Sequence, residues 1–161
     1  MVPHSIVTAF LLVITGSTAA FADEIIQMTP PEYKAFSDVA REFGNIQNFQ
    51  PQNGGAAAEV LNDDFKYFVY IPGRNGKACE EKCSVQLSVC NENWKKPDYD
   101  DFGDWDNKHF SYITWDKDSG TCLSLDAPNY GQSLTKDKLG SILSVWLKEV
   151  DKFKQKFATT N

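Results

Sequence analysis

The stretch "SLTKDKLGSILSVWLKEVDKFKQKF" (residues 133–157) gives the strongest structural signal in the chain. Its apolar residues recur at intervals of three and four, which places them on one stripe of a helix. Thr135 or Ser133 can cap the N-terminus, and lysines line the polar face and the C-terminal end, where positive charge suits the helix dipole. The pattern predicts one long amphipathic helix over residues 135–157 that lies across a sheet. The stripe consists of Leu139, Ile142, Leu143, Trp146, Leu147, Val150 and Phe153.

Runs of alternating apolar and polar residues predict the sheet. Residues 57–62 and 65–71 form two predicted strands with an aspartate turn between them. Residues 83–91 form a third, in which every second residue is apolar. Residues 109–115 and 121–127 flank the turn "DKDSG", which predicts a hairpin.

The remaining segments predict helices and connections. Residues 29–45 carry an apolar stripe typical of a core-facing helix, and residues 46–58 are predicted as a connector because Pro51 and two glycines break regular structure. Residues 92–110 are expected to contain a short helical turn that carries Phe102 and Trp105 into the core. The order predicts an α+β fold with about five strands in one sheet and helices at both ends.

The first residues are typical of a secretory signal peptide. Residues 6–15 are uncharged, and small residues follow, with Ala20 and Ala22 placed as a cleavage site. A buried N-terminal strand and an uncleaved anchor are the alternatives. Cleavage after Ala22 would leave 139 of the 161 residues as a single domain, residues 23–161, in the periplasm or outside the cell.

Charge and hydropathy restrict the partners. The formal net charge is −6, whereas nucleic acids and anionic membrane surfaces attract proteins with a positive footprint. The apolar run at residues 6–15 is shorter than a membrane span, and no run of membrane length follows it. We therefore expect neither nucleic acid as a partner nor a membrane span after cleavage, and the sequence points to no cofactor.

The cysteines Cys79, Cys83, Cys90 and Cys122 are even in number, and in an exported chain they are expected to pair. Their spacing departs from haem-attachment and thioredoxin motifs, and the only histidine after residue 22 is His109. Structural disulfides are therefore favoured, with metal binding and redox activity as alternatives. Of the three possible pairings we favour Cys79–Cys83 with Cys90–Cys122.

Two acidic stretches could bind calcium. Residues 98–106 hold five aspartates, and residues 116–121 ("DKDSGT") resemble the start of a calcium loop. We favour a solvated acidic loop and a hairpin turn for these residues, because the second stretch lacks the distal glutamate of a calcium loop and its glycine comes one position early. The sequence contains none of the common nucleophile, phosphate-loop or zinc-protease motifs, and we predict no catalytic residue.

Several pieces of the chain together resemble the YbjN family of bacterial proteins, which is associated with sensory-transduction regulation. The matching pieces are "FKYFVYIPGRNGKAC", "CSVQLSV", "DWDNKHFSYITWDKDSGTCLSLD" and the helix that follows "GQSLTKDKL". Within them, Trp105, Asn107 and Phe110 stand close to a family element in which Asn often follows the Trp, where this chain has Asp106. The resemblance implies a fold similar to type III secretion chaperones, with a curved antiparallel sheet and helices on one face. It also implies that the protein is not an enzyme.

Two hypotheses for function follow. The first is an exported, non-enzymatic YbjN-like protein that binds another protein or a peptide, through an exposed sheet face or the mixed face of Phe68 and Tyr70. The alternative is a small periplasmic thiol-redox or hydrolytic enzyme that uses Cys79 and Cys83 or the aspartate-rich segment.

Overall fold

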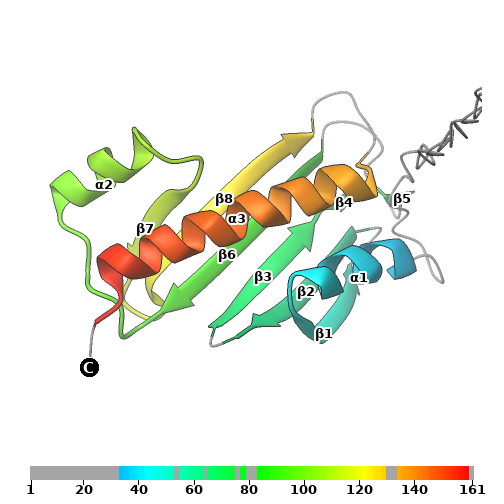
Figure 1. The fold of residues 1–161 in the computed structure, drawn as a ribbon, viewed down its shortest axis with the longest axis horizontal. Coiled ribbons are helices and arrows are strands. Elements are labelled where there is room, and N and C mark those ends of the chain that lie inside the picture. Colours follow the sequence, from blue (N-terminus) through cyan, green and yellow to red (C-terminus); the bar gives the residue numbers. More distant parts are fainter. Residues whose placement is uncertain are drawn as a thin grey trace, which may run out of the picture.

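The structure is a computed structural model that describes residues 33–52, 55–63, 65–74, 77–78, 83–129 and 134–159. The predicted signal peptide, residues 1–22, lies outside the described residues. Figure 1 shows the elements, which in chain order are α1 (Tyr33–Glu42), β1 (Asn45–Gln52), β2 (Gly55–Asn62), β3 (Phe65–Ile71), β4 (Gly73–Arg74), β5 (Lys77–Ala78), β6 (Cys83–Asn91), α2 (Tyr99–Asp106), β7 (Tyr112–Asp116), β8 (Gly120–Asn129) and α3 (Lys136–Phe157).

The main sheet has six antiparallel strands in the order β1-β2-β3-β6-β8-β7, and β4 and β5 form a separate two-stranded pair. Helices α1 and α3 lie over the same face of this sheet, with α3 crossing its centre (Figure 1). The predicted α+β fold, an antiparallel sheet with N- and C-terminal helices, is confirmed. The sheet has six strands rather than five.

The additional strand is β1, which occupies the segment predicted as a connector, so that prediction was wrong. β1 pairs with β2 and lies at the edge of the sheet. Ile46 and Phe49 pack against the core, and the register shifts between Ile46 and Asn48. Pro51 is tolerated because an edge strand has one side without ladder hydrogen bonds. Pro51, which suggested a connector, therefore lies within an edge strand.

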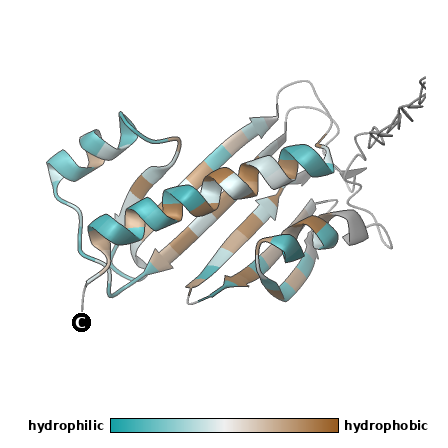
Figure 2. Cartoon of the chain, viewed as in Figure 1, coloured by the Kyte–Doolittle hydropathy of each residue, from teal (hydrophilic) through white to brown (hydrophobic). Residues whose placement is uncertain are grey.

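Helix α3 forms as its apolar stripe predicts. Thr135 is the N-cap, and its side-chain oxygen accepts a hydrogen bond from the Lys138 N–H at 3.3 Å. Hydrophobic and hydrophilic residues alternate along the helix in Figure 2. Full burial of one such large apolar side chain contributes roughly 1.5–3 kcal/mol, which makes this helix the main cover of the sheet. The fully buried members of the stripe are Leu139, Leu143, Trp146, Val150 and Phe153, and Phe157, one turn further, is fully buried as well.

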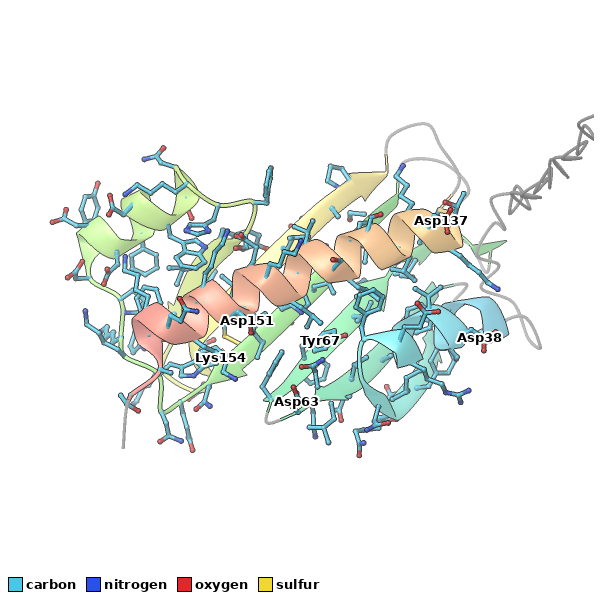
Figure 3. The ribbon with its side chains drawn as sticks, viewed as in Figure 1. Asp38, Asp63, Tyr67, Asp137, Asp151 and Lys154 are labelled. Atoms are coloured by element: carbon cyan, nitrogen blue, oxygen red, sulfur yellow. A yellow bond between two sulfur atoms is a disulfide. The ribbon has the colours of Figure 1, made fainter. Side chains whose placement is uncertain are left out.

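The strands under α3 present the predicted faces. Tyr67 and Val69 of β3 and Val85 and Leu87 of β6 are buried on the helix side. Tyr67 is labelled in Figure 3. Its ring lies 6.2 Å from that of Trp146, and its hydroxyl donates to the main-chain oxygen of Phe43, the residue after α1. The two helices and the sheet therefore share one core. No helix among the described residues is long and apolar enough to cross a membrane.

The β7–β8 hairpin differs from its prediction at one end. The turn is as expected: Asp116 accepts hydrogen bonds from the main-chain N–H groups of Asp118 and Ser119, and Gly120 has a φ of 75°. β7, however, begins at Tyr112 rather than at residue 109. The residues just before it leave the sheet, which determines the shape of the site described next.

Candidate functional site

The outer edge of β8 is covered over only half its length. β7 pairs with residues 120–124 of β8, whereas β8 continues to Asn129. Over residues 125–129 the inner edge of β8 pairs with β6, and no strand among the described residues pairs with the outer edge. This segment of β8 is therefore an open strand edge.

The direction of the main-chain groups on this edge follows from the register. Cys90 and Cys122 are directly opposite each other, with Cα atoms 4.1 Å apart, and such a short separation is typical of a non-hydrogen-bonded pair. The main-chain N–H and C=O of Cys122 thus point away from β6, toward the outer edge of β8. The same holds for every second residue after Cys122 in this strand. Asp126 and Pro128 share this phase, so their main-chain groups point to the open edge. Pro128 fits this position because it has no N–H to leave unpaired there.

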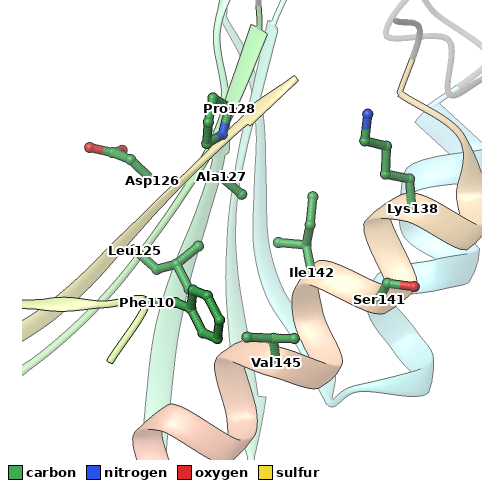
Figure 4. Close-up of a pocket in the computed structure, with 9 residues that line it drawn as sticks. All are labelled: Phe110, Leu125, Asp126, Ala127, Pro128, Lys138, Ser141, Ile142 and Val145. Carbon is green, nitrogen blue, oxygen red and sulfur yellow. The ribbon is translucent and has the colours of Figure 1, made fainter. Parts of the chain in front are cut away.

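An apolar groove lies beside the open edge, between β8 and the N-terminal half of α3 (Figure 4). Its volume is about 320 Å³. Phe110 is 83% exposed and Val145 is 38% exposed, and they line the same groove; exposed apolar residues that gather in one groove are typical of a contact surface. The groove is lined by Phe110, Leu125, Asp126, Ala127, Pro128, Lys138, Ser141, Ile142 and Val145.

Phe110 lies in the groove because the chain bends away from the direction of β7 just before that strand begins. The register that pairs Tyr112 with Ser124 would place Phe110 opposite Asp126, on the sheet face away from the helices. Phe110 instead lines the groove on the side of α3, near Leu125 (Figure 4). The position opposite Asp126 is left without a strand in the part of the chain that the structure describes.

A buried polar cluster fixes the chain on both sides of Phe110. We call it the Glu149 cluster, and its members are Glu149, His109, Ser111, Trp105 and Lys152. The Ser111 hydroxyl donates to Glu149 Oε2 at 2.8 Å, and His109 Nδ1 lies 3.0 Å from the same oxygen. Trp105 Nε1 donates to Ser111 Oγ at 3.0 Å, and Lys152 Nζ lies 3.1 Å from Glu149 Oε1. His109 also stacks on Trp105, with ring centroids 3.7 Å apart.

These hydrogen bonds determine the charge of Glu149. Burial by itself raises the pKa of this carboxyl group, but the hydrogen bonds from Ser111, Lys152 and His109 outweigh that effect and hold the pKa below its usual value. Glu149 is therefore an ionised carboxylate that is only 3% exposed. The Ser111 hydroxyl donates its hydrogen bond to Glu149 and not to His109, so the cluster has the geometry of a structural anchor rather than of an activated nucleophile.

The mixed face of Phe68 and Tyr70, which the sequence suggested as a contact surface, lies on the opposite side of the sheet. Phe68 is 48% exposed beside a shallow hollow of about 200 Å³. Polar Asn48 and Gln50 line much of the rest of that hollow. Both hollows lie beside a strand edge, because Asn48 and Gln50 belong to edge strand β1. The groove at β8 differs in that its lining is mainly apolar.

The cysteine predictions have separate outcomes. The structure contains the predicted disulfide between Cys90 and Cys122. It lies on the sheet face away from the helices, next to Ser88 and Ser124 in the two strands. Cys79 and the side chain of Cys83 lie outside the described residues, so the Cys79–Cys83 pairing stays a prediction.

The acidic segment is mostly a helix, α2, preceded by its cap. Asp98 and Asp101 form a capping box at its N-terminus. Asp101 also makes ion pairs with Lys156 at 2.8 Å and Lys95 at 3.6 Å, and its pKa is lowered, chiefly by the hydrogen bond from Lys156. Within the described residues no three acidic, histidine or cysteine side chains gather as metal ligands do. Trp105 is buried, as predicted.

Sequence reasoning missed Phe110, which lines the groove, and Glu149, which anchors the chain beside it. Phe110 was expected within a strand, and the polar residues on both sides of it, His109 and Ser111, fit that alternation, so the sequence carries no sign of its exposure. Glu149 stands between apolar neighbours on the helical stripe of α3, and a single acidic residue at such a position signals a buried partner.

No protein-family model matches the chain. No curated protein matches it either.

Proposed function

We propose that this protein is an exported, non-enzymatic binding or regulatory module, related to the YbjN family, that holds a segment of another protein in the groove between β8 and α3. The observation that carries the proposal is the combination of exposed apolar side chains and an open strand edge at one place. Surfaces that combine the two are common where proteins bind peptides.

Three further observations support this proposal. The Cys90–Cys122 disulfide fits an oxidising compartment, in agreement with the predicted signal peptide. The family resemblance favours a protein without enzymatic activity. The Glu149 cluster uses its serine, histidine and carboxylate to hold the chain around Phe110, which favours a structural role for the residues that could otherwise suggest hydrolysis.

Site-specific photo-crosslinking in the native host tests the proposal. A photoreactive residue replaces Ser141, which is exposed at the groove, and in a control it replaces Asp106, which is exposed on α2. We expect a recurrent protein adduct from position 141 only, and we expect Phe110→Ser to abolish it while the circular dichroism spectrum stays unchanged. Equal adducts from both positions, or an adduct that persists in the Phe110→Ser variant, would contradict the proposal.

A further inference from the structure

We propose that the occupant of the groove is an extended segment of a different protein, which joins the open edge of β8 as an additional strand. Its alternate side chains enter the groove, and a cationic side chain stands opposite Asp126. This inference rests on the proposed function and specifies the chemistry of the partner.

The main-chain groups of the open edge select an extended partner. Asp126 presents an N–H and a C=O to the edge, and Pro128 presents a C=O, as the phase of β8 requires. A docked helix satisfies its own main-chain groups internally and offers none to this edge. An extended segment supplies one donor or acceptor for each of the three, and addition of such a strand is an established mode of peptide recognition.

The groove determines what the side chains of that strand are. Successive side chains of a strand point to opposite faces of the sheet, so the residues on either side of the one opposite Asp126 point toward α3. There they meet Leu125, Ile142, Val145 and the exposed ring of Phe110. Apolar side chains at these two positions would bury surface that is now exposed to water.

The other face determines the charge. Asp126 is exposed on the side of the sheet away from the helices, where the Tyr112 hydroxyl donates to its carboxylate at 3.3 Å. The side chain directly across an antiparallel pair lies on the same face and within reach. Because the protein carries a net charge of −6, the complementary residue at this position is lysine or arginine.

A second copy of this chain is a poor occupant of the same edge. If two β8 edges met around a twofold axis with Asp126 opposite Asp126, like charges would face each other directly, which is destabilising. If Asp126 met Pro128, each pair would lack one hydrogen bond, because proline has no N–H. Pairing of two β8 edges is therefore disfavoured, and the edge is better suited to a strand from a different chain.

The test uses short random peptides displayed on phage and selected for binding to the full chain without its signal sequence. We expect enriched peptides that alternate apolar and other residues and carry lysine or arginine between two apolar positions. Asp126→Ala keeps the edge N–H but removes the charge, and it should weaken binding about 2–5-fold. Asp126→Pro also removes the N–H, and it should weaken binding by roughly a further tenfold. A version of the enriched peptide is N-methylated at the main-chain N–H groups that would face β8, and it should fail to bind the unaltered protein. This experiment tests strand addition without any change to the protein.

Each other outcome has a definite meaning. Enriched peptides with apolar residues at intervals of three and four, or full binding of the methylated peptide, would overturn strand addition and leave the proposed function standing. Alternating peptides without a basic residue would overturn the role of Asp126. A dimer that Asp126→Pro dissociates would assign the edge to a second copy. If no enriched peptide is affected by Phe110→Ser, both this inference and the proposed function fail.

Discussion

Removal of the Ser111 hydroxyl tests whether the Glu149 cluster anchors the chain beside the groove. This hydroxyl accepts a hydrogen bond from Trp105 Nε1 at 3.0 Å and donates one to Glu149 Oε2 at 2.8 Å. Ser111 is 2% exposed and Trp105 is 3% exposed, so neither group has ready access to water. Ser111→Ala therefore removes two hydrogen bonds from a buried site with little change in volume.

The expected cost follows from the two bonds. An indole N–H left without a partner in a buried site costs about 1–3 kcal/mol, and a hydrogen bond to an ionised group contributes about 1.5–3 kcal/mol. The second loss is partly offset, because Glu149 keeps its contacts with His109 and Lys152. We expect the free energy of unfolding to fall by about 3 kcal/mol, which for a domain of this size corresponds to a fall in Tm of roughly 10 °C.

Urea unfolding followed by far-ultraviolet circular dichroism measures this loss. Ser141→Ala, on the exposed side of α3, is the matched control and should change stability by less than about 0.5 kcal/mol. Trp105→Phe should cost less in the Ser111→Ala background than in the wild type, because the unpaired N–H is then absent, with a coupling of about 1–2 kcal/mol. A loss for Ser111→Ala no larger than the control, or equal costs of Trp105→Phe in both backgrounds, would refute the reasoning.

Three other perturbations are predicted. The double change Cys90→Ser with Cys122→Ser should lower the free energy of unfolding by roughly 3–4 kcal/mol in urea, since the bridge spans 32 positions. The pKa of Glu149 is lower in the folded protein than its ordinary value of 4.5, so this carboxylate stabilises the fold above pH 4.5, and the stabilisation is lost as the pH falls through the pKa of the folded state. Over this acidic range Tm should therefore change less with pH for Glu149→Gln than for wild type. Gly120→Ala should lower Tm, because φ is +75° and the new Cβ would lie 2.5 Å from the main chain just after β6. Gly103→Ala in α2, where the new Cβ meets no atom within 4 Å, should raise Tm slightly. Equal effects of the two substitutions would contradict this prediction.

The elements that could be predicted from sequence are those with a strong, uninterrupted period. In α3 the apolar stripe continues for five turns of helix, and β3 and β6 alternate cleanly, so burial of one face fixes both the type of element and its orientation. The Cys90–Cys122 pair followed from the same alternation, because both residues lie on the face that the apolar residues avoid. In each case the local pattern and the tertiary structure favour the same conformation.

The features that could not be predicted depend on contacts between distant residues. β1 is a strand because β2 supplies its hydrogen bonds and the core accepts Ile46 and Phe49, although its composition is that of a loop. The bend before β7 depends on Glu149, which lies 38 residues after Ser111 in the chain. A sequence pattern records neither partner, so the strand before the hairpin turn was predicted to begin at residue 109 rather than at Tyr112, and Phe110 was expected within it.

The open edge of β8 and the bend before β7 have a common cause. In the register of β7, Phe110 would continue the strand opposite Asp126 and close the edge. The hydrogen bonds of His109 and Ser111 to Glu149 instead tie the chain on both sides of Phe110 to α3, which draws that residue to the helix side of the sheet. A buried ionised carboxylate lowers stability relative to a well-packed apolar residue. Here the carboxylate of Glu149 leaves the position opposite Asp126 vacant and places the ring of Phe110 beside it. The Glu149 cluster therefore keeps this part of the edge open, and Ser111→Ala should weaken the proposed peptide binding as well as stability.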